Sequence, residues 1–214
     1  MILKTSKAFV DIFFFDRLVG EMRTPAPADC LRAARALLDL SQREAAAGAK
    51  TTQRSVSAAE NAENVLLETN LQLVDFYISQ GIEFLGEASI GKDVVRAGAR
   101  FAAPPSPDVE TVVKSTFRAV DFAVPFRAAR ALMEKEQAEV ANAVGLTVAV
   151  IQNLERGKIS RSPQEQLRAW YEANDVEFTG WGDITTGKYY GVGVRWKASK
   201  AAPFETSPNL ADDR

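Results

Sequence analysis

A thirty-residue segment of this 214-residue chain occurs twice in related form. Positions 31–60 align with positions 126–155 at a fixed offset of 95, and eleven of the thirty pairs are identical. The run RAARAL at 32–37 returns unchanged at 127–132, and weaker similarity extends to 98–101 against 193–196. Self-similarity of this length predicts two copies of one folding unit, each large enough to bury a small core.

The repeat divides the chain into five segments. We expect an N-terminal extension over 1–28, a first domain over 29–101, a proline-rich linker and connecting segment over 102–124, a second domain over 125–197, and a disordered tail over 198–214.

The apolar stretch at 8–19 is too short to span a bilayer, and it lacks the cleavage site of a secretory signal. We expect it either to cover core or to pair with another chain.

Within each repeat the apolar spacing predicts helices. Leu31, Ala34 and Leu37 follow the helical period, and Ser41 with Glu44 forms a capping box for a second helix. Third helices begin at the caps Thr52 and Thr147.

A last helix in the second copy is expected to begin at the capping box Ser162 and to end near 174, with 71–80 as its counterpart. The period then shifts towards two. Residues 176–181 and 189–196 predict a β-hairpin, and 83–85 with 94–101 is its weaker first copy. The segment 109–124 fits either a short helix or a helix leading into a strand.

Composition excludes several kinds of site. The chain has one cysteine, Cys30, and no histidine. An intrachain disulfide is therefore impossible, and histidine-based catalysis and the usual zinc clusters are excluded. We expect neither enzymatic activity nor a cofactor or metal.

The residues at 137–157, QAEVANAVGLTVAVIQNLERG, closely resemble the Cro/cI-type (XRE) helix-turn-helix family. In the first repeat, LSQ at 40–42 and TTQRSV at 51–56 resemble lambdoid phage repressors of that family. The resemblance implies a mainly α fold, made of two tandem five-helix Cro/cI-like helix-turn-helix domains, each followed by a short β-hairpin. It also implies a structural ion pair in each repeat, Arg35 with Glu60 and Arg130 with Glu155.

The same resemblance implies which residues contact DNA. In the first repeat these are Gln42, Thr51, Thr52, Gln53, Arg54 and Ser57. In the second they are Gln137, Thr147, Val148, Ala149, Gln152 and Asn153. Glutamine suits the N6 and N7 atoms of adenine and arginine suits the O6 and N7 atoms of guanine, whereas valine and alanine offer only apolar contact. The turn at Gly145 has Lys50 as its counterpart, so the first turn is expected to form without glycine's freedom at positive φ.

Charge favours the first repeat as the DNA-binding copy. The chain carries a net charge of −2, but 31–60 has five basic and three acidic residues, and 126–155 has three basic and four acidic. Phosphate attraction depends on charge within roughly 10 Å, so this local difference matters more than the sum.

These observations predict a sequence-specific transcription regulator that binds double-stranded DNA through the first repeat. The second repeat is either a second DNA-binding unit or an assembly surface that could also engage a protein partner. We expect a homodimer on an inverted repeat, with a monomer acting as its own pseudo-dimer as the competing arrangement. The expected setting is the cytoplasm and nucleoid of a bacterium, with the chain encoded by the cell, a phage or a mobile element. The alternative function is a protein-interaction module, of the antiactivator or antitoxin kind, that keeps the fold without binding DNA.

Overall fold

The computed structural model describes residues 24–63, 65–87, 94–122, 124–158 and 160–198. The expectations for the apolar stretch at 8–19 and for nearly all of the C-terminal tail fall outside these residues.

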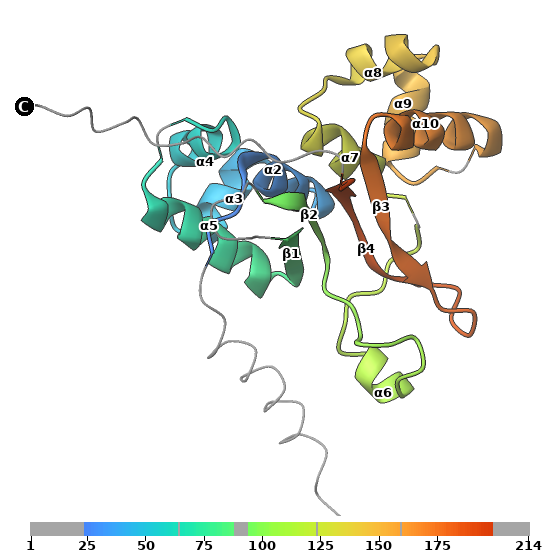
Figure 1. Ribbon diagram of the computed structural model, residues 1–214, viewed down its shortest axis with the longest axis horizontal. Coiled ribbons are helices and arrows are strands. Elements are labelled where there is room, and N and C mark those ends of the chain that lie inside the picture. Colours follow the sequence, from blue (N-terminus) through green and yellow to red (C-terminus); the bar gives the residue numbers. More distant parts are fainter. Residues whose placement is uncertain (1–23, 64, 88–93, 123, 159, 199–214) are drawn as a thin grey trace, which may run out of the picture.

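Both repeats run through the same succession of elements (Figure 1). The first repeat contains α2 (Ala28–Leu37), α3 (Gln42–Gly48), α4 (Gln53–Glu60), α5 (Leu67–Ser79), β1 (Ile82–Glu87) and β2 (Val95–Phe101). The second contains α7 (Phe126–Leu132), α8 (Gln137–Val144), α9 (Val148–Glu155), α10 (Arg161–Ala173), β3 (Val176–Gly182) and β4 (Tyr189–Trp196). Between them lies the single turn α6 (Thr111–Lys114).

The expectation of a mainly α fold with two tandem five-helix domains is wrong. Each repeat has four helices in the described part of the chain, and the two hairpins join in one four-stranded antiparallel sheet of order β1-β2-β4-β3. The physical reason is that an isolated two-stranded hairpin is marginally stable and leaves strand edges unpaired. Each hairpin satisfies one edge with the other, so the repeats share a sheet.

The central strand pair has a two-fold symmetric register. Gly98 lies opposite Arg195, Ala99 opposite Val194, and Arg100 opposite Gly193. At the repeat offset of 95, Gly98 corresponds to Gly193 and Arg100 to Arg195. The outer pairs therefore exchange under a two-fold rotation, and a pseudo-two-fold axis passes through the middle pair.

Two equivalent glycines allow this close pairing. A Cβ atom on Gly98 would lie 2.2 Å from the carbonyl oxygen of Val194, and one on Gly193 would lie 2.3 Å from that of Ala99. Because the obstructing atoms belong to the backbone, any side chain at either position would push the strands apart.

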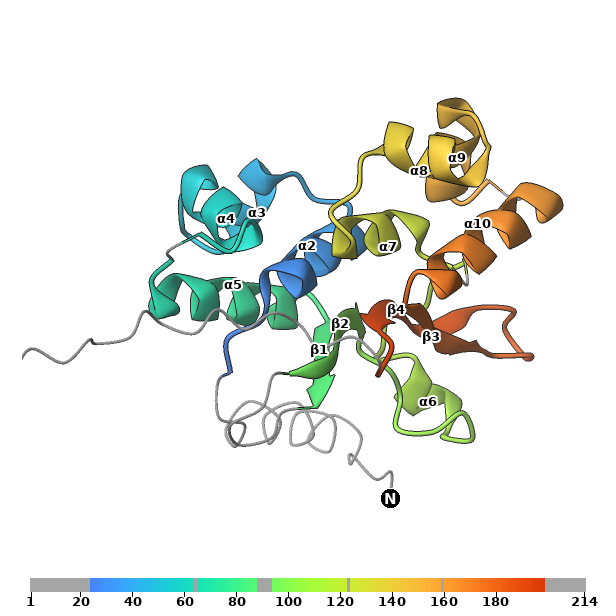
Figure 2. The same ribbon diagram turned by 45° about the horizontal axis from the view of Figure 1, so that its top comes forward.

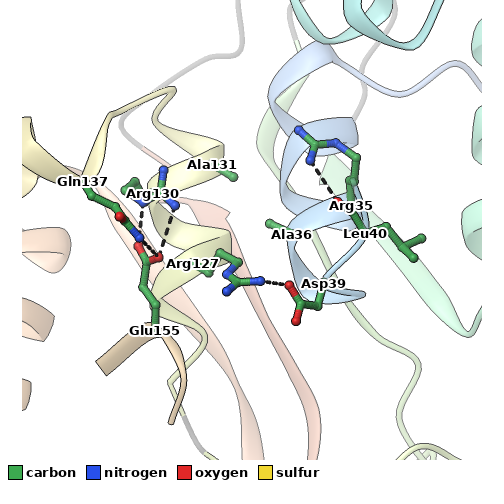
Figure 3. A pocket seen from close by; sticks show the side chains of 9 residues that line it. All are labelled: Arg35, Ala36, Asp39, Leu40, Arg127, Arg130, Ala131, Gln137 and Glu155. Carbon is green, nitrogen blue, oxygen red and sulfur yellow. Dashed lines mark hydrogen bonds and ion pairs between the residues drawn. The ribbon is translucent and has the colours of Figure 1, made fainter. Parts of the chain in front are cut away.

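Helices α2 and α7 repeat the same symmetry above the sheet. Arg127 of α7 pairs with Asp39 after α2 (Figure 3). Arg32 of α2 pairs reciprocally with Glu134 after α7, at 3.2 Å. Arg32 also donates through Nε to the carbonyl of Ala131 at 3.1 Å. Two copies of one surface thus face each other, as in the interface of a symmetric homodimer.

The backbone of the two repeats agrees even where it is strained. Residues with positive φ recur at equivalent positions: Asp39 (57°) and Glu134 (54°), Lys50 (55°) and Gly145 (74°), Ala62 (54°) and Gly157 (77°), and Gly81 (80°) and Asp175 (64°). Lys50 forms its turn without glycine's freedom, as expected, and does so in the left-handed region. That residue adopts the glycine geometry at a cost of roughly 1–2 kcal/mol.

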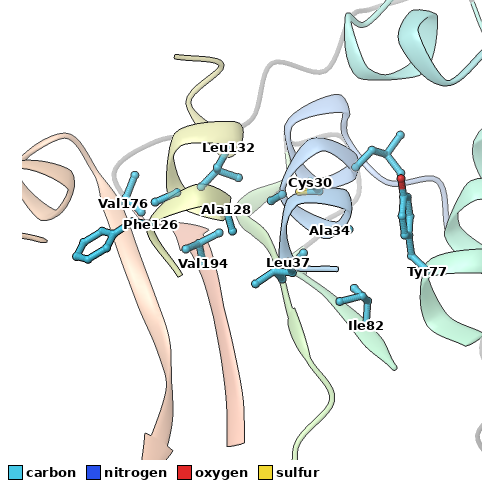
Figure 4. Packing of buried hydrophobic residues seen from close by; sticks show 14 of the residues in the cluster. Cys30, Ala34, Leu37, Tyr77, Ile82, Phe126, Ala128, Leu132, Val176 and Val194 are labelled. Carbon is cyan, nitrogen blue, oxygen red and sulfur yellow. The ribbon is translucent and has the colours of Figure 1, made fainter. Parts of the chain in front are cut away.

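The core lies between the helices and one face of the sheet (Figure 4). Leu37, Leu132 and Val194 are buried there, with Tyr77 and Phe126 in the flanking parts of the same cluster. Full burial of a side chain of this size contributes about 1.5–3 kcal/mol. The core is continuous across the repeats, which makes the pair one packed body.

The linker is fixed against the second hairpin. Val120 forms a bridge with Tyr189, and Lys114 lies 3.4 Å from Asp183. The guanidinium of Arg118 lies 4.4 Å from the ring centre of Phe101. The segment 109–124 thus forms one helical turn followed by an isolated β-bridge, which is intermediate between the short helix and the helix leading into a strand that its sequence allowed.

The predicted start of the last helix is also wrong. Helix α10 begins at Arg161, after Ser160 at the N-cap position, whose side chain makes no capping hydrogen bond. Ser162 therefore lies inside the helix and Pro163 occupies its first turn. A proline is tolerated there because the first-turn N–H groups have no partner within the helix. Within the described part of the chain no helix has the length and hydrophobicity needed to cross a membrane.

Candidate nucleic-acid interface

The candidate site consists of two short helix pairs, α3 with α4 and α8 with α9. Figure 2 shows these pairs on opposite flanks of the central α2 and α7, and both on the side away from the sheet. Because α2 and α7 are related by the pseudo-two-fold axis, the flanking pairs occupy equivalent places in the two repeats.

The first pair is built as its sequence predicts. Ser41 Oγ accepts from the backbone N–H of Glu44, whose carboxylate accepts in return from the Ser41 N–H at 2.8 Å. These bonds hold the pKa of Glu44 below its usual range, chiefly through the backbone N–H of Ser41. Thr52 caps α4 by accepting from the N–H of Ser55 at 3.1 Å. The predicted capping box and the cap at Thr52 are confirmed.

The second pair reaches the same geometry with different residues. Glu136 stands where the first repeat has Ser41, and its N–H donates to Glu139 at 2.7 Å. Gly145 makes the left-handed turn, and Thr147 caps α9 by accepting from the N–H of Val150 at 3.3 Å.

A buried ion pair anchors each third helix to its first helix. Arg35 Nε lies 2.5 Å from Glu60 Oε1, and the side chain of Glu60 is 2% exposed. Arg130 Nε lies 2.5 Å from Glu155 Oε1, and the side chain of Glu155 is 1% exposed. Both predicted ion pairs are present.

Each arginine also donates to the carbonyl of the residue five positions on, Leu40 or Lys135, at 3.0 Å. Burial works against the charge of Arg35, but its hydrogen bonds and its attraction to Glu60 prevail and raise its pKa.

Buried tyrosines line the same part of each core. Tyr77 and Tyr171 are fully buried, and burial, reinforced by the nearby Glu60 or Glu155 charge, raises the pKa of both phenols. Each phenol thus lies close enough to the ion pair of its repeat to sense the charges of both partners.

Gln42 and Gln137, which were expected to contact DNA, are engaged inside the protein. Gln42 donates its amide to Glu60 Oε2 at 2.9 Å, and Gln137 donates to Glu155 Oε2 at 2.8 Å (Figure 3). Gln152, also expected to contact DNA, donates to the side-chain carbonyl oxygen of Gln137 at 3.2 Å. These amides satisfy a buried carboxylate, a demand that a sequence pattern does not reveal.

The remaining predicted contact residues lie at or near the surface. In the first repeat Thr52, Gln53 and Arg54 are exposed, while Thr51 and Ser57 are half-buried. In the second repeat Thr147, Val148 and Ala149 are exposed, and Asn153 is half-buried. Gln53, Arg54 and Ser57 also line a shallow depression together with Gln42.

Four exposed cations lie beside these helices. Arg43 on α3 and Lys50 before α4 were counted in the local charge of the first repeat, whereas Arg156 and Lys158, which follow the end of α9, escaped the sequence reasoning. The repeat comparison stopped at 155, just short of these two residues.

A polar cavity of about 300 Å³ lies between the repeats (Figure 3). Its three arginines are already paired, Arg35 with Glu60, Arg130 with Glu155, and Arg127 with Asp39. The cavity therefore belongs to the contact between the repeats and offers no free charge to a ligand.

Comparison with protein-family models, with curated proteins and with solved structures finds no match for this chain. Its function is therefore inferred from the geometry of the two helix pairs.

Proposed function

We propose that this chain is a sequence-specific DNA-binding transcription regulator in which two helix-turn-helix units of one chain act as the halves of a dimer. The observation that carries the proposal is the symmetric register of β2 with β4. Gly98 lies opposite the counterpart of Arg100 in the second repeat, and Arg100 lies opposite the counterpart of Gly98. A pseudo-two-fold axis presents the two units to half-sites of opposite orientation, and such units bind half-sites centred about 34 Å apart.

The chemistry of α4 supports the proposal. Gln53 and Arg54 are exposed in its first turn, where their side chains are free to enter a major groove. Glutamine pairs with adenine and arginine with guanine through two hydrogen bonds each. The exposed cations Arg43 and Lys50 add attraction for phosphate.

The pairing of the two hairpins within one molecule favours the binding of a single chain to each DNA site. The N-terminal apolar segment, the hairpin edges or both were candidates for joining two molecules, but β2 and β4 pair with each other within one molecule. A homodimer formed through the N-terminal extension would be a different assembly, with four helix-turn-helix units.

A protein-interaction module is the second candidate, and one observation favours it. Val148 is 38% exposed at the start of α9, and Ala149 beside it is also exposed. An apolar helix end of this kind suits a protein partner, and the net charge of −2 disfavours non-specific binding to DNA.

A regulator of the proposed kind acts on nucleoid DNA in the bacterial cytoplasm.

A salt titration separates the two candidates. Full-length protein is mixed with a randomised duplex library, the bound duplexes are sequenced, and the affinity of the best duplex is measured from 50 to 300 mM salt. We expect log K to fall linearly with log salt, with a slope of about −0.9 for each phosphate contacted. Mass by light scattering, with and without DNA, is expected to give one chain per duplex. Failure to enrich any sequence contradicts the proposal, and two chains per duplex favour the homodimer.

A further inference from the structure

The two helix-turn-helix units differ most where a DNA contact would form. Gln53 and Arg54 of α4 have as counterparts Val148 and Ala149 of α9, and all four side chains are exposed. The side chains of Gln53 and Arg54 offer several hydrogen-bonding groups, whereas those of Val148 and Ala149 offer none. The two helices thus place polar side chains in one repeat and apolar side chains in the other at equivalent positions.

The next polar residue of α9 is also withdrawn from DNA. Gln152 donates to Gln137, which in turn donates to the buried Glu155. Its counterpart Ser57 instead lines the surface depression beside Gln53. The second unit therefore has less capacity for hydrogen bonds to base edges than the first.

The exposed cations sit at opposite ends of the two units. In the first they are Arg43, Lys50 and Arg54, before and at the start of α4; the second has Ala138, Gly145 and Ala149 at these positions. In the second they are Arg156 and Lys158, after the end of α9; the first has Asn61 and Glu63 there. Both units can thus attract phosphate, but along different parts of the backbone.

Resting on the proposed function, we infer that the chain binds a directional, non-palindromic DNA site in one orientation. Arg54 and Gln53 contact guanine and adenine in the half-site of α4 through hydrogen bonds. The half-site of α9 is held by Arg156 and Lys158 on phosphates and by apolar contact of Val148 with a thymine methyl group. The purines define one end of the site, and the methyl group defines the other.

Single-atom changes in the DNA test this division. In the selected duplex, guanine is replaced by 7-deazaguanine, which lacks the N7 acceptor, and thymine by uracil, which lacks the methyl group. We expect 7-deazaguanine to weaken binding roughly 5- to 100-fold in one half-site and less than about 2-fold in the other. We expect uracil to have the opposite preference, with a smaller loss. Equal sensitivity of both half-sites to each base analogue overturns the inference but leaves the proposed function intact. If the unmodified protein prefers no DNA sequence at all, both the inference and the proposed function are overturned.

A swap of residues provides a gain-of-function test. The variant Val148→Gln/Ala149→Arg gives both helices the same first-turn residues. We expect its preferred site to change from an asymmetric sequence to an inverted repeat of the α4 half-site. The matched variant Gln53→Val/Arg54→Ala is expected to lose its preference for guanine while it keeps salt-dependent binding. An unchanged preferred site in the first variant contradicts the inference.

The orientation can be read directly from cleavage by a tethered reagent. Cys30, the sole cysteine of the sequence, is fully buried, and burial raises the pKa of its thiol. A cysteine introduced by Ala47→Cys on α3 or by Asn142→Cys on α8, equivalent exposed positions, therefore reacts selectively with an iron chelate. We expect each tether to cut one half of the site, and the two tethers to cut opposite halves. Cutting of both halves by either tether means binding in two orientations or as a symmetric dimer, and overturns the inference.

Discussion

Ala99 and Val194 face each other across the middle of the sheet, and they hold the same position in the two repeats. The chain is thus paired with itself about an axis through these two residues. The reciprocal ion pairs of Arg32 and Arg127 with residues of the other repeat obey the same axis. This contact between the repeats sets the arrangement of the two helix-turn-helix units.

Gly98→Ala is expected to destabilise the protein by at least about 2 kcal/mol, because its Cβ would meet the Val194 backbone at 2.2 Å. Gly193→Ala, the equivalent change, is expected to cost a similar amount. Gly182→Ala is the control, since its Cβ would meet only the Tyr189 ring, at 3.2 Å. Urea unfolding measures all three, and equal stability of Gly98→Ala and wild type would contradict the close approach.

Arg35→Ala is expected to cost about 3–5 kcal/mol, because it leaves the carboxylate of Glu60 buried and unpaired. The double variant Arg35→Met/Glu60→Leu removes both charges and is expected to be more stable than the single one. Thermal melts compare the variants, with Arg54→Ala as an exposed arginine control. A melt of Arg35→Ala within a degree of wild type counts against the anchoring role.

Ala62→Gly is expected to stabilise the protein by about 0.5–1 kcal/mol. Ala62 has a φ of 54°, whereas its counterpart is Gly157. Relief of the left-handed strain exceeds the entropy that glycine gains in the unfolded chain. Gly157→Ala, the matched reverse change, is expected to lower stability by a similar amount, and a melt in which both variants shift in the same direction refutes the explanation.

Arg54→Ala and Gln53→Ala are each expected to lower affinity for the selected duplex by about 1–3 kcal/mol, because each removes a two-bonded base contact. Both side chains are exposed, so unfolding should be unchanged. Gel shifts at fixed salt measure the effect, and Asn142→Asp on the exposed face of α8 tests for a general effect of charge. Unchanged affinity in both alanine variants shows that α4 does not contact the bases.

The sheet contributes a pH dependence through Glu177. The hydrogen bond from Arg195, 2.5 Å away, is the main cause that lowers the pKa of Glu177, with Arg96 acting in the same direction. A lowered pKa in the folded state gives stability that is complete above the unfolded value of about 4.3 and is lost as the pH falls through the lower folded value. Urea midpoints at pH 7 and pH 3.5 should therefore differ less in Glu177→Gln than in wild type. If the urea midpoint changes by the same amount between pH 7 and pH 3.5 in both proteins, Glu177 does not contribute to the pH dependence of stability.

Local structure was largely predictable from the sequence. The cap at Thr52 and the final strand, predicted over 189–196 and observed as Tyr189–Trp196, follow from side-chain chemistry and from spacing along a short stretch. The ion pair of Arg35 with Glu60 was expected only because the two positions resemble those of a known helix-turn-helix family, and the structure contains it.

The partner of each hairpin was not predictable. An alternating pattern identifies a strand, but it does not specify that β2 pairs with a strand some 95 residues away. That choice depends on the packing of α2 on α7, which brings the two glycine-containing strands together. The role of Gln42 was hidden for a related reason, because its partner Glu60 is buried only once the helices have packed.

The covalent link between the repeats has one further consequence. In a homodimer every substitution appears on both sides of the axis, so a change that suits one face is imposed on the other. Here Val148 can stand where the first repeat has Gln53, because each position is encoded separately. One half of the molecule is therefore free to diverge under natural selection while the other keeps its chemistry and both keep their shared axis.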